Sequence, residues 1–275
     1  MHQRSAHAIG RRALLAAAAA LPAPALAESR LRIGGTGMGL AIMGHLCAAY
    51  RRLRGGPEAE ILPSLGSGGG LRALAAGAIH VAIVTRAPSA EAPAPGLQLI
   101  PLARTPLALA GDATRPAGDI PLATLIALLE GSMTAWPDGT PVRLVRRNRM
   151  EADWQLLASL APEMAQPTEA ARRRPGLLTA DTDQDNAQAL ESLPGAFGTI
   201  TLGQVLSENR RVTLFSLNGT PPRLTALEDG RYPMARPVSL VIRSADLEML
   251  APLTGFMTGP DGRAILASYG FAAPA

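Results

Sequence analysis

The stretch that decides the fold is residues 31–84, which read LRIGGTGMGLAIMGHLCAAYRRLRGGPEAEILPSLGSGGGLRALAAGAIHVAIV. Three short apolar runs, at residues 31–33, 59–63 and 81–84, are typical of buried strands. A glycine-rich turn and then a helical pattern follow each of the first two runs. Because strands buried on both faces and joined by helices are characteristic of parallel sheets, this stretch predicts a parallel α/β sheet.

The same alternation continues along the rest of the chain without repeats or a low-complexity linker. Apolar runs predict strands at 99–110, 142–145, 196–200, 212–217 and 237–242. Helical spacing predicts helices at 122–129, 152–160, 186–193, 247–257 and 262–268. With 275 residues, 47% of them hydrophobic, the chain has enough apolar material for one large domain or two smaller lobes.

The basic residues of this chain are all arginine, and lysine is absent. This excludes the Walker A phosphate loop, Schiff-base enzymes and Ser-Lys nucleophiles, because each of them needs a lysine.

The first 27 residues have the organisation of a signal peptide. Arginines at positions 4, 11 and 12 precede an apolar stretch at 13–21, and Ala25-Leu26-Ala27 supplies a small-x-small cleavage site. Arg11-Arg12 favours a twin-arginine signal, while an ordinary Sec signal fits the same residues. Both predict an exported chain that is cleaved after Ala27 and resides in the periplasm.

Cleavage would leave a nearly neutral protein. Residues 1–27 contain three Arg and no acidic residue, so their removal lowers the formal charge from +4 to +1. A nucleic-acid partner is not expected, because such binding needs a basic excess. The single cysteine, Cys47, excludes an internal disulfide, and with His45 and His80 it does not have the spacing of a zinc site. We therefore predict neither a metal nor another cofactor.

The two glycine-rich loops do not match the common catalytic or nucleotide-binding motifs. Leu40 stands where a dinucleotide-binding fingerprint needs its last glycine, and Leu65 stands where a nucleophile elbow needs its first. Each loop nevertheless combines a hydroxyl, Thr36 or Ser67, with a helix N-terminus, which suits an anion. One such loop can equally be a turn with a helix cap, but two at adjacent parallel strands favour a ligand site.

Several segments in this order resemble the PstS-like phosphate-binding proteins of ABC importers, and the resemblance extends over nearly all of residues 30–271. The segments are Gly35-Thr36-Gly37-Met38, Gly66-Ser67-Gly68-Gly69-Gly70, Ala82-Ile83-Val84-Thr85-Arg86-Ala87-Pro88, residues 119–136, Leu193-Pro194-Gly195-Ala196-Phe197-Gly198, residues 231–237 and residues 260–263.

This resemblance implies an α/β protein with the type II periplasmic binding protein fold, in which two α/β lobes enclose a ligand cleft. Residues 28–103 and 220–275 would form the first lobe and residues 104–219 the second. The implied protein is a non-enzymatic monomer whose partners are a small inorganic or organic anion, with phosphate the first candidate, and an ABC permease in the inner membrane.

The resemblance also assigns the ligand contacts of the first lobe. These are hydroxyl and amide groups in the first loop, the start of the second helix, and polar groups at the end of the third strand. The residues are Thr36, Gly37, Met38, Ser67, Gly68, Gly69, Thr85 and Arg86.

The second lobe departs from the family pattern. Where the family has Arg-x-Asp-Gly-Ser-Gly-Thr, residues 147–153 read RNRMEAD. Arg147 keeps the guanidinium that can hold an oxyanion in bidentate fashion, but Arg149 replaces the Asp, and Glu151 and Asp153 replace the Ser and Thr. We expect a site that still binds an anion without strictly separating phosphate from sulfate. In the alternative interpretation the two arginines are solvated surface charges, and the carboxylates only favour a helix start.

Thr182 and Asp183 are further candidates, since they either simply cap the helix at 186–193 or also face the cleft. The sequence as a whole predicts an exported solute-binding protein that captures a phosphate-like oxyanion and delivers it to an ABC importer. A receptor for a different anion, or a sensing module of the same fold that signals to a membrane partner, are the alternatives.

Overall fold

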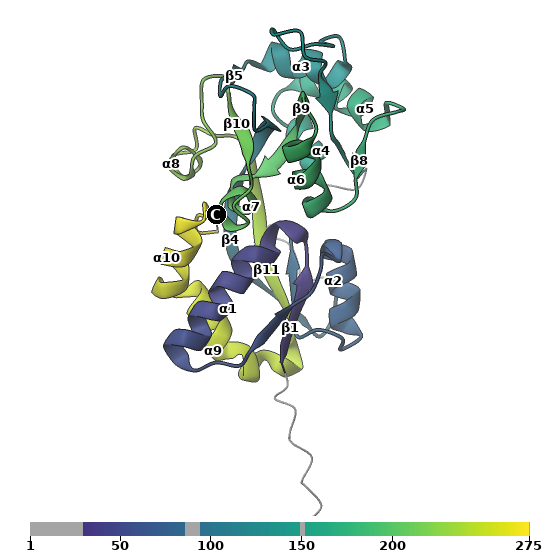
Figure 1. Ribbon diagram of the computed structural model, residues 1–275. Helices are drawn as coiled ribbons and strands as arrows, with labels where there is room; N and C mark the ends of the chain where they lie inside the picture. The colour runs from purple at the N-terminus through teal and green to yellow at the C-terminus, as the bar shows by residue number, and fades with distance from the viewer. Residues whose placement is uncertain (1–29, 86–93, 149–151, 275) are drawn as a thin grey trace, which may run out of the picture.

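The computed structural model describes residues 30–85, 94–148 and 152–274. The predicted signal peptide and the predicted site residues Arg86 and Arg149 lie outside these ranges. The chain forms two α/β lobes, one above the other in Figure 1.

The first lobe, the lower one in Figure 1, is built on the strands that the sequence predicts. Strands β1 (Leu31–Gly35), β2 (Ala59–Ile61) and β3 (Val81–Val84) are parallel, and β11 (Ala235–Arg243) pairs with β3 in the antiparallel direction. The lobe also contains η1 (Gly37–Gly39), α1 (Leu40–Arg54), α2 (Gly66–Ala75), η3 (Ser244–Asp246), α9 (Leu247–Thr258) and α10 (Pro260–Ser268). The predicted parallel arrangement of the first three strands is confirmed.

The long strand β4 (Leu97–Asp112) runs through both lobes, and the chain returns from β10 to β11 through residues 218–234. Residues 97–106 pair with β11, and residues 107–112 pair with β9 (Ala196–Thr201) and β10 (Val212–Leu217). Because one strand takes part in both lobes, the sheet runs on from one lobe into the other.

The second lobe completes its sheet with β5 (Asp119–Ile120) and β6 (Arg143–Leu144), while β7 (Arg146–Arg147) and β8 (Thr179–Ala180) form a small parallel pair. Its helices are α3 (Leu122–Glu130), α4 (Asp153–Ala158), η2 (Pro162–Met164), α5 (Ala165–Arg173), α6 (Asp183–Ser192), α7 (Leu202–Ser207) and α8 (Leu224–Glu228). The sequence analysis did not predict α5, α7 or α8.

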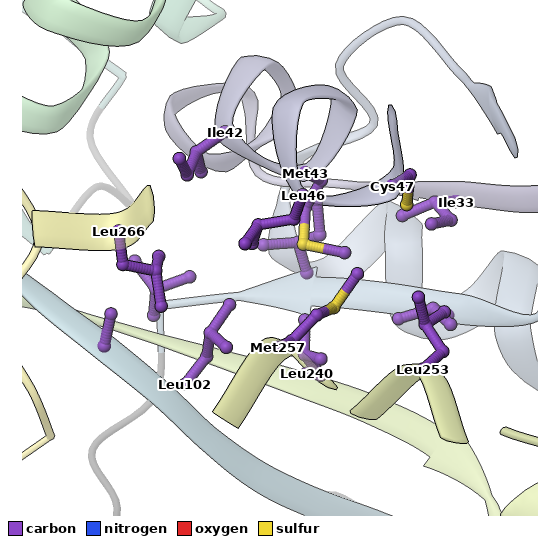
Figure 2. Close-up of a cluster of buried hydrophobic side chains, with 14 of the residues drawn as sticks. Ile33, Ile42, Met43, Leu46, Cys47, Leu102, Leu240, Leu253, Met257 and Leu266 are labelled. Atoms are coloured by element: carbon purple, nitrogen blue, oxygen red, sulfur yellow. The ribbon is translucent and has the colours of Figure 1, made fainter. Parts of the chain in front are cut away.

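Each lobe has its own hydrophobic core. In the first lobe, Met43 and Leu46 of α1 face Leu240 of β11 and Met257 of α9 (Figure 2). In the second lobe, side chains of β4, β9 and β10 pack against α3 and Trp136. Residues 226, 232 and 234 contribute to this second core, and the predicted lobe boundaries stay a prediction.

Among the described residues, no helix combines the length and the apolar character needed to cross a membrane.

Candidate functional site

The first loop of the first lobe begins at a glycine that the backbone requires. Gly35 ends β1 with a φ of 138°, a conformation that side chains rarely adopt. The next residue, Thr36, donates its N–H to the carbonyl of Ile83 at 3.0 Å, which fixes the loop to β3. In this position, the hydroxyl of Thr36 and the N–H of Met38 point toward the second lobe.

Both of these groups donate to one carboxylate of the second lobe. The Oδ2 atom of Asp183 accepts the N–H of Met38 at 2.8 Å and the hydroxyl of Thr36 at 3.1 Å. The neighbouring side chain, Gln184, donates to the carbonyl of Gly37 at 3.0 Å. The first turn of α6 is therefore one place where the second lobe contacts the first, and α7 also contacts the first lobe, where Nε2 of His45 lies 3.0 Å from the carbonyl oxygen of Ser207.

Arg147 holds the other side of the same carboxylate. It lies on β7, is only 3% exposed, and donates from Nη2 to Oδ1 of Asp183 at 2.7 Å. Its Nη1 donates to the carbonyl of Thr182 at 2.8 Å. The interpretation of Arg147 as a solvated surface charge is wrong, because the side chain is buried between β7 and α6.

Thr182 is the N-cap of α6, and it forms a capping box with Asp185. The capping role is thus observed, and α6 begins three residues before the predicted helix at 186. The structure brings six predicted site residues together at one contact between the lobes: Thr36, Gly37, Met38, Arg147, Thr182 and Asp183.

Ser67 and Thr85 form a second polar pair at the same edge of the sheet. The N–H of Thr85 donates to the hydroxyl of Ser67 at 3.2 Å, and the two hydroxyl oxygens are 3.4 Å apart. Gly68 and Gly69 lie with Ser67 in the first turn of α2. The loop before this helix is tied to β1 by the N–H of Leu65, which donates to the carbonyl of Gly35 at 3.0 Å.

A buried ion pair that the sequence analysis missed lies next to Arg147. Asp153 is 3% exposed, and its carboxylate pairs with Arg236, which is 2% exposed. The hydroxyl of Thr199 donates to Oδ2 of Asp153 at 2.7 Å, and Nε of Arg147 lies 3.9 Å from that oxygen. Asp153 is therefore neither a repulsive charge in the site nor simply a helix-start residue, since Arg236 compensates it. In the sequence, the only signal for this ion pair was Arg236 at the beginning of the apolar strand β11.

Charge is balanced among these four buried or nearly buried groups. The two guanidinium groups of Arg147 and Arg236 face the two carboxylates of Asp153 and Asp183. Burying an uncompensated charge is strongly unfavourable, so each of these charges depends on its partner. The substituted positions 149 and 151 lie outside the described residues.

An open groove of about 630 Å³ lies beside the contact between the lobes. Its apolar wall includes Leu40, Ile61 and Leu62 of the first lobe, and its polar wall consists of Thr182, Gln184 and Glu208 of the second. Within the part of the chain that the structure describes, no cluster of three or more His, Cys, Asp or Glu side chains is placed to hold a metal ion.

The sequence profile of the PBP superfamily domain matches residues 22–259. The chain belongs to the PBP superfamily. This membership places it among binding proteins rather than enzymes, as predicted. No curated protein sequence matches the chain.

Solved structures with the same fold cover 89–90% of this chain. A Clostridium perfringens protein described as a phosphate ABC transporter substrate-binding protein, with bound phosphate, has a TM-score of 0.73 at 18% identity, covering 89% of this chain and 99% of its own. An ABC-type phosphate transport receptor from Vibrio cholerae has a TM-score of 0.61 at 18% identity, covering 89% of this chain and 100% of its own. The periplasmic molybdate-binding protein of Azotobacter vinelandii has a TM-score of 0.62 at 17% identity, covering 90% of this chain and 100% of its own. These similarities confirm the predicted type II fold.

Proposed function

We propose that this PBP-superfamily protein is an exported, monomeric receptor that binds a small oxyanion between its lobes and delivers it to an ABC permease in the inner membrane. One observation carries the proposal. The hydroxyl of Thr36, the N–H of Met38 and the guanidinium of Arg147 converge from two lobes on one pair of carboxylate oxygens. Donors arranged in this way bind the oxygens of an anion, and those of Arg147 bind them with charge assistance.

The choice of an oxyanion is supported by the solved structures of this fold, among which are proteins described as binding phosphate and molybdate. Phosphate is the first candidate for this chain. A different oxyanion is the second, because the loop at 147–153 departs from the phosphate-binding pattern in sequence. The ligand contacts proposed here are made by the donors of Thr36, Met38 and Arg147. Gly37 and Thr182 lie beside these donors, and Ser67 and Thr85 lie at the side of the contact between the lobes.

The proposal is tested by thermal unfolding of the chain from Glu28, dialysed free of phosphate, with phosphate, sulfate, molybdate and small carboxylates added in turn. A ligand at a hundred times its dissociation constant stabilises a protein by about 2.7 kcal/mol, or roughly 5–10 °C for a chain of this length. Arg147→Gln should abolish the shift. The control Arg143→Gln removes an exposed guanidinium four residues away and should leave the shift unchanged.

A shift with phosphate alone would establish a phosphate receptor, and a shift with another anion would establish a receptor of changed specificity. If none of these anions shifts the unfolding temperature, the proposal is wrong and the sensing alternative is favoured.

A further inference from the structure

The donors proposed for an external anion are already engaged by a residue of the chain itself. Asp183 accepts from Met38 at 2.8 Å and from Thr36 at 3.1 Å through Oδ2, and from Arg147 at 2.7 Å through Oδ1. A carboxylate is itself a small anion with two acceptor oxygens. In this structure it makes the contacts that we assign to the bound oxyanion.

The backbone of the first lobe approaches this carboxylate closely. A Cβ atom built on Gly37 would lie 2.9 Å from Cβ of Asp183 and 3.0 Å from its Oδ2. The glycine therefore lets the backbone of the first lobe approach the first turn of α6 directly. Gln184 closes the same approach by donating to the carbonyl of Gly37.

We propose that the carboxylate of Asp183 occupies the position of the anion and joins the two lobes, so that a solute oxyanion binds only by displacing it. This inference rests on the proposed function and deepens it, because it makes Asp183 the residue that sets affinity and selects among anions. Asp183 was expected to contact the ligand, whereas here it replaces the ligand.

Displacement determines which anions are favoured. Among the described residues, Arg147 is already paired with the carboxylate of Asp183, and Arg236 with that of Asp153. A singly charged anion that displaces Asp183 gains no charge interaction with Arg147 over the carboxylate it replaces. A doubly charged oxyanion gains attraction to Arg147, so we expect divalent oxyanions such as sulfate, molybdate or hydrogen phosphate to bind more tightly than nitrate or acetate.

Because the anion has to displace the carboxylate of Asp183, the natural sequence has a lower apparent affinity for that anion. When the binding-competent state is a minor fraction of the molecules, the apparent dissociation constant increases by the inverse of that fraction. Removing the carboxylate should therefore tighten the binding of a divalent oxyanion by about tenfold or more, if the open position is populated in a tenth of the molecules or fewer.

The test is isothermal titration calorimetry of the chain from Glu28 with phosphate, sulfate, molybdate and nitrate at constant ionic strength. Asp183→Ala removes the carboxylate, and Asp183→Asn keeps its shape without its charge. The control Asp181→Ala removes an exposed carboxylate two residues away, so it reports any general effect of charge on anion affinity. Thermal unfolding of each variant shows that it is folded.

We expect both Asp183 variants to bind divalent oxyanions more tightly than the natural sequence, with the alanine variant the tighter, and Asp181→Ala to behave like the natural sequence. If the natural sequence binds an anion and Asp183→Ala binds it equally or less tightly, the inference is overturned while the proposed function stands. If none of the proteins binds any anion, the proposed function is wrong, and so is the proposal that an anion displaces Asp183.

A second measurement follows the contact between the lobes without any ligand. Small-angle X-ray scattering should give a larger radius of gyration for Asp183→Ala than for the natural sequence, because the carboxylate that joins the lobes is gone. An unchanged radius in the folded variant would overturn the statement that Asp183 holds the lobes together.

Discussion

Replacing Asp153 by alanine would test the buried ion pair on which the site is built. The carboxylate of Asp153 pairs with Arg236, accepts the hydroxyl of Thr199 at 2.7 Å, and lies 3.9 Å from Nε of Arg147. Asp153 and Arg236 are 3% and 2% exposed, so solvent cannot replace the lost carboxylate. Removing one partner of a buried pair costs about 3–5 kcal/mol, because the other charge stays buried without compensation.

For a chain of this length, that loss lowers the unfolding temperature by about 6–20 °C, at roughly 2–4 °C per kcal/mol. Thermal unfolding followed by circular dichroism measures it. The matched control is Asp229→Ala, which breaks an exposed ion pair with Arg231. The two charged groups are 2.8 Å apart, and the side chains of Asp229 and Arg231 are 57% and 61% exposed. An exposed pair contributes about 0–1 kcal/mol, so the control should melt within about 2–4 °C of the natural sequence.

A double variant completes the reasoning. Arg236→Met alone should also destabilise the protein, because it leaves the carboxylate of Asp153 with Arg147 at 3.9 Å as its remaining ion-pair contact among those described. Asp153→Ala combined with Arg236→Met should be more stable than the sum of the two single losses predicts, since neither charge is then left behind. The buried pair does not hold the site together if Asp153→Ala unfolds at the same temperature as the control Asp229→Ala. The same conclusion follows if the stability losses of Asp153→Ala and Arg236→Met simply add in the double variant.

Three further predictions concern other buried groups. Burial raises the pKa of Asp112, but the hydrogen bonds that its carboxylate accepts from Thr114 and Gly195 lower the pKa by more than burial raises it. The pKa of Asp112 therefore lies below its ordinary value. Asp112→Asn should therefore cost about 1–3 kcal/mol at pH 7. Urea unfolding should show the difference shrinking below about pH 4, where the carboxylate is protonated first in the unfolded chain and, at lower pH, in the folded protein. Burial raises the pKa of Cys47 to about 12, so its reaction with a disulfide reagent at pH 8 should be fast only after unfolding by denaturant. A Cβ atom on Gly203 would clash with the buried ring of Phe271, so Gly203→Ala should lower the free energy of unfolding by about 1–3 kcal/mol or more, whereas Gly255→Ala, with open space around it, should not.

The parts of the fold that the sequence predicted are those set by local patterns. Apolar runs and glycine turns located β1, β2 and β3. The helices that it missed are short or weakly apolar. α5 is rich in polar and charged residues, and α7 and α8 have only six and five residues. Such segments give too few turns for the helical period to be recognised.

The structure brings six of the predicted site residues together, but the contacts among them were not predicted. Thr36 and Asp183 are 147 positions apart, and Asp153 and Arg236 are 83 apart. No local pattern reports a pairing over such distances, because it depends on how the two lobes come together. The sequence could thus show that Asp153 had replaced a hydroxyl residue, but not that an arginine of β11 would compensate it.

The ion pair between Asp153 and Arg236 changes how the substituted loop at residues 147–153 is interpreted. By sequence, an acidic residue in an anion site is a repulsive charge that weakens binding. In the structure, Asp153 is neutralised by Arg236, and the carboxylate that opposes an incoming anion comes from a different element, the first residue of α6. Asp183 opposes the anion because it uses the same donors from Thr36, Met38 and Arg147, and not merely because it is negative. A residue that uses the ligand's own contacts can both weaken the binding of a solute and hold the lobes together in its absence. For this reason the comparison between Asp183→Ala and Asp181→Ala is decisive, because the two variants differ in those contacts and not in charge.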